Sequence, residues 1–170
     1  MARVAVMHKV AQAVATEINT QDPGSWALDL QPPAVFSYAD WDEQLEDLDC
    51  LHVDVVPAGF SETEIDDRGD IAYLVQTDIG IRKRFTQDHQ SSNTSRIELA
   101  HLAQLALLTE QLYEHFAAAS AAARLPTLTQ AVYSSSEIKA PYLRKHLREL
   151  RQWTSIISIT HDYTKPTGAE

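Results

Sequence analysis

Histidine and cysteine are the side chains in this sequence best suited to bind a metal ion, and their spacing does not favour a metal site. The single cysteine is Cys50, and the seven histidines are His8, His52, His89, His101, His115, His146 and His161. Zinc sites generally combine these residue types at short spacings, such as two histidines one turn apart on a helix. No two of the histidines here are four residues apart. We therefore predict no metal ion and no other cofactor.

The usual sequence signals of a nucleophilic active site and of a nucleotide-binding site are also missing. The chain has five glycines and contains neither a Walker loop nor a GxGxxG motif, the two patterns whose backbone N–H groups hold phosphate. Cys50 stands directly before a predicted strand, without the surrounding signature of a nucleophile, and we interpret it as a buried structural thiol. The sequence predicts a protein that is not an enzyme.

Carboxylates gather in residues 58–70, where Arg68 is the one opposing charge. They are Glu62, Glu64, Asp66, Asp67 and Asp70. A calcium loop needs a glycine and a terminal glutamate at fixed positions, and the spacing here provides neither. We predict a solvated, mobile loop and regard its five carboxylates as a candidate assembly loop.

Two short stretches concentrate positive charge. The first is residues 82–84, and the second holds Arg144, Lys145, Arg148 and Arg151, partly on one face of a short predicted helix. A solvated helix face is one interpretation of the second stretch. The other is a basic patch between subunits, in which these four side chains contact an acidic neighbouring subunit.

Length and charge limit the classes of function. A chain of 170 residues fits one domain, and we expect residues 1–164 to form it and residues 165–170 to be a flexible tail. The formal net charge of −10 disfavours nonspecific binding to nucleic acid, because phosphate contacts need Lys and Arg. No run of residues approaches the roughly 20 apolar positions that a membrane span needs, and the first residues do not resemble a signal peptide. We expect a protein that stays in the cytosol of the cell that makes it and does not contact a membrane.

Hydrophobic periodicity predicts the elements that position these side chains. Apolar residues recur at helical spacing over residues 4–18, and a second, longer helix is expected from a capping box at Ser95 to Pro126, with Leu99, Leu102, Leu105, Leu112 and Phe116 buried. Alternation predicts strands at residues 51–55, 73–81 and 154–163, with shorter ones near residues 35–41 and 131–133. Pro57 is expected to stop the first long strand. The fold class predicted is α+β, a mostly antiparallel sheet of about four to five strands flanked by an N-terminal helix and one long central helix.

Three segments carry a resemblance to a known family. They are the strand at residues 51–57, the strand end at residues 79–84 and, above all, residues 150–160 with the sequence LRQWTSIISIT. Over roughly residues 3–163 the chain resembles the small neck and tail-completion proteins of long-tailed bacteriophages, and within them it is most similar to tail terminators. That group is expected to form a hexameric ring that caps the tail tube, and it brings no catalytic residue with it.

The resemblance implies a virion protein of the tail or neck, made in the host cytoplasm. Its expected partners are further copies of itself, the tail tube protein and a head-tail connector or stopper protein. DNA is expected to pass through the ring without specific binding, since an excess of carboxylates repels phosphate. Another neck or head-completion protein, or a minor tail protein, remains the alternative within this class. A small binding module or enzyme outside phage biology is the alternative beyond it.

Overall fold

The computed structural model describes residues 5–22, 24–42, 45, 50–65, 71–85, 94–118 and 124–165. These residues include the helices α1 (Val6–Asn19), α2 (Thr94–Ala118) and α3 (Arg144–Glu149). The strands are β1 (Val35–Phe36), β2 (Leu51–Ile65), β3 (Ile71–Arg84), β4 (Arg124–Leu125), β5 (Leu128–Ala140) and β6 (Gln152–Lys165). The predicted α+β class is confirmed.

One sheet organises the molecule, in the order β1-β2-β3-β6-β5-β4. All neighbours are antiparallel except β1 and β2, which are parallel. Four strands are long, and the other two have two residues each. The strand predicted at residues 73–81 lies in the centre of the sheet, as expected from its apolar residues on both faces, and β6 lies beside it.

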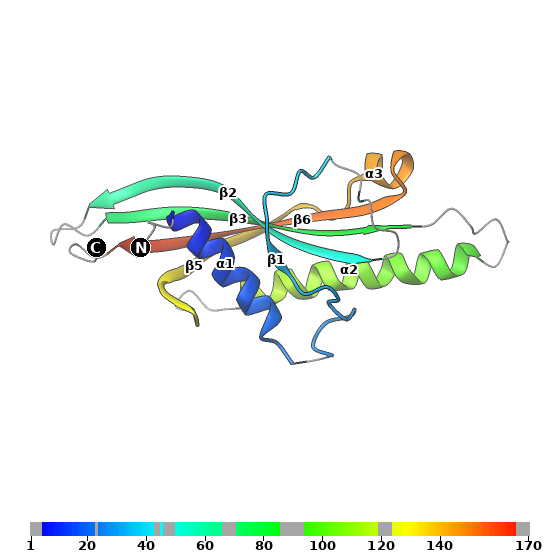
Figure 1. Ribbon diagram of the computed structural model, residues 1–170, viewed down its shortest axis with the longest axis horizontal. Helices are drawn as coiled ribbons and strands as arrows, with labels where there is room; N and C mark the ends of the chain where they lie inside the picture. The colour runs from blue at the N-terminus through cyan, green and yellow to red at the C-terminus, as the bar shows by residue number, and fades with distance from the viewer. Residues whose placement is uncertain are drawn as a thin grey trace.

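One face of the sheet carries the main core, and α1 and α2 lie on it (Figure 1). The stripe predicted for the first helix is confirmed, because Val10, Val14 and Ile18 are buried. In α2, Leu105, Leu108 and Leu112 are buried, and Thr109 shares a 2.8 Å hydrogen bond with Ser155 of β6. The assignment of Leu99 to the buried stripe was wrong, since its residue is 64% exposed.

Residues 58–65 of the predicted loop at residues 58–70 are strand, and residues 66–70 lie outside the described part of the chain. β2 continues past Pro57 to Ile65 and pairs with β3 along almost its whole length. Pro57 interrupts the ladder without ending it, because the register shifts between Pro57 and Gly59 and the strands then resume pairing. The prediction that proline stops this strand was wrong. A bulge absorbs the irregularity.

The other face of the sheet is covered over only half of its length (Figure 1). Residues 37–42 and α3 lie over one half. The other half, which we call the open half-face, has no described helix on it. The strand register shows which side chains point to this face. Its polar and small side chains include Gln76, Asp78, Ser135, Glu137, Lys139, Ser158, Thr160 and Asp162.

β6 ends at Lys165, one residue beyond the predicted domain boundary, and residues 166–170 lie outside the part of the chain that is described. Within the described residues, no helix is both long and apolar enough to cross a membrane.

His161 gives the core a specific pH dependence. It is 1% exposed within β6, its ring meets Tyr133 edge to face at 6.4 Å, and its Nδ1 has no hydrogen-bond partner among the described residues. Burial therefore lowers the pKa of His161 from 6.5 to about 4, because the charged imidazolium would lose its hydration.

We predict that the protein loses stability as the pH falls below 6.5. The unfolded chain then binds a proton on His161 that the folded chain does not bind until about pH 4, and the loss reaches about 2 kcal/mol at pH 5. Urea unfolding of wild type and His161→Gln at pH 7.5 and pH 5 measures it. The wild type should lose about 2 kcal/mol more than the variant over this interval. Equal losses would show that His161 does not titrate in this way.

Candidate functional site

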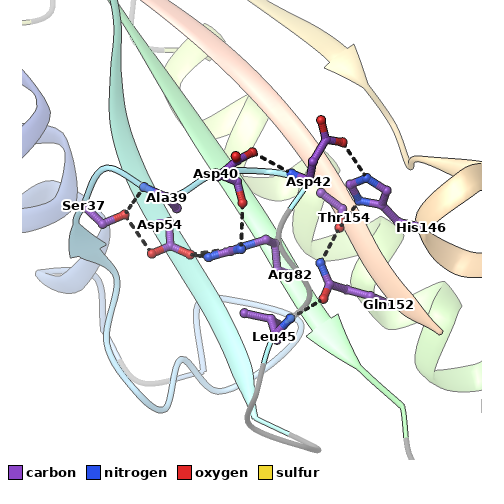
Figure 2. Close-up of polar contacts among 10 residues, drawn as sticks. All are labelled: Ser37, Ala39, Asp40, Asp42, Leu45, Asp54, Arg82, His146, Gln152 and Thr154. Atoms are coloured by element: carbon purple, nitrogen blue, oxygen red, sulfur yellow. Dashed lines mark hydrogen bonds and ion pairs between the residues drawn. The ribbon is translucent and has the colours of Figure 1, made fainter. Parts of the chain in front are cut away.

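A buried ion pair lies under the segment that crosses the covered half of the sheet (Figure 2). Arg82 on β3 donates to Asp54 on β2, with 2.7 Å between Nη2 and Oδ2, and both side chains are 8% exposed. The Ser37 hydroxyl donates to the other carboxylate oxygen at 2.9 Å, and Arg82 Nη1 donates to the carbonyl of Asp40 at 3.3 Å. The pair therefore binds residues 37–42, which we call the strap, to the sheet.

Trp41 of the strap packs closely on Arg82 and Gly80 of β3. Its ring lies 5.6 Å from Arg82 Cζ, within range of a cation–π interaction. The ring also rests on Gly80 of β3, where an added Cβ atom would overlap the indole. Glycine at this position lets the strap approach the backbone of the sheet directly.

A chain of hydrogen bonds extends from the strap to α3 (Figure 2). His146, the buried residue of α3, contacts Thr154 Oγ1 through Nδ1 at 3.0 Å and Asp42 Oδ1 through Nε2 at 3.2 Å. Thr154 Oγ1 also accepts a hydrogen bond from the side-chain amide of Gln152. The Oε1 atom of the same amide accepts one from the backbone N–H of Leu45. Thr154 can donate to Nδ1 while Nε2–H donates to Asp42, so that each of these polar atoms has a partner. The network fixes α3 on the sheet.

Most residues of the predicted basic patch are exposed on α3. Arg144, Lys145 and Arg148 are exposed on this helix, Arg151 is exposed just after it, and none of the four pairs with a carboxylate among the described residues. Arg151 has a φ of 49°, a left-handed conformation that glycine usually provides after a helix. The structure thus brings these four cations together at one place.

Two of the five carboxylates in the predicted acidic cluster lie on β2. Glu62 is an exposed residue of β2, and Glu64 belongs to the same strand. Asp66, Asp67 and Asp70 lie outside the described residues. The expected loop is therefore a strand at Glu62 and Glu64.

Cys50 is exposed, so its interpretation as a buried thiol was wrong. Among the described residues no three His, Cys, Asp or Glu side chains are grouped so that they could hold a metal ion. His146 and His161 serve within the fold, as a hydrogen-bonded support and a core residue.

The comparisons with known proteins give a structural likeness. No family model matches the chain, and no curated protein matches its sequence. A solved structure to which the chain is similar is the PVC sheath/tube terminator, in its extended state, of an extracellular contractile injection system. The identity is 12%, the TM-score is 0.42, and the match covers 100% of this chain and 60% of the other. The chain thus spans less than two thirds of that terminator's length.

We predict that Asp54→Ala destabilises the protein by about 3 kcal/mol, because it leaves the Arg82 guanidinium buried without its partner. The double variant Asp54→Ala, Arg82→Met should be more stable than the single variant, since it removes the unpaired charge. Guanidinium chloride unfolding measures both. Glu114→Ala, a substitution of an exposed glutamate on α2, is the control and should change the stability by less than about 0.5 kcal/mol. If Asp54→Ala resembles this control, the pair does not hold the strap.

Gly80→Ala should displace the strap and cost about 2 kcal/mol, because the new methyl group takes the place of the Trp41 ring. Gly59→Ala is the matched control on β2, where the added atom meets only the flexible side chain of Gln76, at 3.1 Å from its Oε1. Tryptophan fluorescence and urea unfolding compare the two variants. A red-shifted emission is expected for Gly80→Ala alone. Equal behaviour would refute the close packing of the strap.

Proposed function

We propose that this protein is a tail terminator, a ring-forming subunit that caps a tail tube and joins it to a head-tail connector or stopper protein. The open half-face of the sheet is the observation that carries the proposal. It consists of long strands, of which β3 and β6 are paired on both sides, and no described helix lies on it. An antiparallel sheet commonly leaves one face to solvent, and in the proposed ring this free face lines the lumen.

The charge of the open half-face supports its orientation toward the lumen of the ring. Asp78, Glu137 and Asp162 lie on it together with one cation, Lys139, which is held by Asp78 at 2.9 Å. Three carboxylates against one ammonium repel phosphate, and six copies multiply this effect around the axis. DNA would pass such a surface without adhering to it. A ring of this kind works through shape and charge, so it requires no catalytic residue.

The residues that resemble tail terminators support the same proposal from a separate direction. The segment at residues 150–160 covers the end of α3 and the first part of β6, the strand that holds both the core and the hydrogen bonds beneath α3. The segment at residues 79–84 contains Gly80 and Arg82, which hold the strap. The resemblance therefore lies on the residues that organise the covered half of the sheet.

We predict that the purified protein forms closed rings. Native mass spectrometry should give a single oligomer near six copies, and negative-stain electron microscopy should show rings with a central hole. A monomer at concentrations of about 100 μM would contradict the proposal.

Deletion of the gene from its genome should give overlong or uncapped tails, because a terminator stops tube growth. Leaking heads beside tails of normal length would instead indicate a head-completion protein. Replacing Glu137 and Asp162 with lysine should leave the ring intact but reduce DNA passage into the host, measured as infectivity per particle.

A further inference from the structure

The hairpin formed by β2 and β3 presents an aromatic side chain beside a carboxylate at one end of the molecule. We call residues 59–63 and 71–75 the arm. Phe60 is 49% exposed and stacks on Tyr73 with 4.7 Å between ring centroids. Glu62, one row further along the same face, is exposed and has no described ion-pair partner. Phe60 and Tyr73 thus form a small aromatic surface with a carboxylate beside it.

The surface of α3 presents the complementary set. Tyr142 is 37% exposed and stacks on the buried Trp153 at 5.3 Å, directly before the unpaired cations Arg144, Lys145 and Arg148. Arg144 and Arg148 are one helical turn apart and therefore project side by side. The network beneath α3 holds this surface rigid. We call Tyr142 and these three cations the basic surface.

The arm and the basic surface lie toward opposite ends of the long axis (Figure 1). They cannot meet within one copy, so each remains available to another copy. A contact between two different surfaces of identical subunits is heterologous, and it closes into a ring when the rotation between subunits permits.

Direct pairing of sheet edges between copies is disfavoured. β1 pairs with β2 only at Asp54 and Val55, so the rest of the outer edge of β2 is free of described strands. That edge contains Pro57, which has no N–H to donate, and two register shifts. The edge of β5 likewise contains two register shifts. Prolines and bulges hinder the addition of a further strand, which leaves side-chain surfaces to hold copies together.

We propose that the arm of one copy docks on the basic surface of the next, with Phe60 against Tyr142 and Glu62 between Arg144 and Arg148. This docking requires that copies of the chain associate, but it does not require a particular number of copies. Only the closure of the copies into a ring rests on the proposed function. The occupant of the basic surface is thus a second copy of this chain.

A charge exchange tests the docking directly. Glu62→Lys gives a copy whose arm and basic surface are both positive, and the double variant Arg144→Glu, Arg148→Glu gives one in which both are negative. Each variant alone should associate at least tenfold more weakly than wild type, measured by sedimentation equilibrium in 150 mM NaCl. An equimolar mixture should recover the wild-type affinity, because alternating copies then match at every contact. Circular dichroism confirms that the variants fold, and Glu114→Lys on α2 is the control that should associate normally.

The outcomes separate this contact from the proposed function. Rings that persist in both variants would refute the docking and leave the terminator proposal standing. Recovery in the mixture with only dimers or open chains would support the docking and contradict the ring. A wild-type protein that stays monomeric, or a mixture that does not recover, would overturn the docking.

Discussion

The ion pair between Arg82 and Asp54 is the interaction on which the covered half of the sheet depends. Two charges removed from water cost several kcal/mol each, and they are tolerated only when every remaining polar atom finds a partner. The strap supplies those partners, a hydroxyl from Ser37 and a carbonyl from Asp40, while Trp41 excludes water from above. The sheet therefore needs the strap, and the strap has one position in which it satisfies the pair.

The position of the strap determines the position of α3. Asp42 at the end of the strap contacts His146 on the buried side of α3, and His146 also contacts Thr154 of β6. A helix of six residues cannot form by its own propensity, because the cost of its first turn is spread over too few hydrogen bonds. α3 depends on this support from below. In this support His146 and Thr154 are buried, whereas the side chain of Asp42, at the end of the strap, is 85% exposed.

Much of the fold could be predicted because periodicity is a local property of the chain. The stripe of Val10, Val14 and Ile18 and the alternation in β6 both reflect one-sided burial, which the sequence displays directly. The length of β2 could not be predicted in this way. Its outer part is paired on one side only and exposed to solvent, so its residues carry the polar composition of a loop. The prediction that Leu99 is buried was wrong for the opposite reason. Its helical spacing is correct, but no described element covers it.

The site was harder to predict than the fold, because its residues are brought together by the sheet. Asp54 and Arg82 are 28 residues apart and meet only through the register of β2 and β3. The alternation of residues 51–55 puts Asp54 on the polar face of its strand, and Arg82 follows the predicted strand at residues 73–81, so the pattern did not indicate that the strap buries both. His146 gave no signal either, because its two partners lie 104 residues before it and 8 residues after it.

Net charge and local charge act on assembly at different distances. Copies that each carry −10 repel one another, but at physiological ionic strength charges separated by more than about 8 Å are largely screened. Contacts between Glu62 and the cations of α3 operate within that distance, and burial beside Phe60 and Tyr142 would protect them further from salt. The sequence thus combines a general repulsion, which salt weakens, with a local attraction, which depends on orientation. Such a combination suppresses random aggregation and favours one geometry of contact.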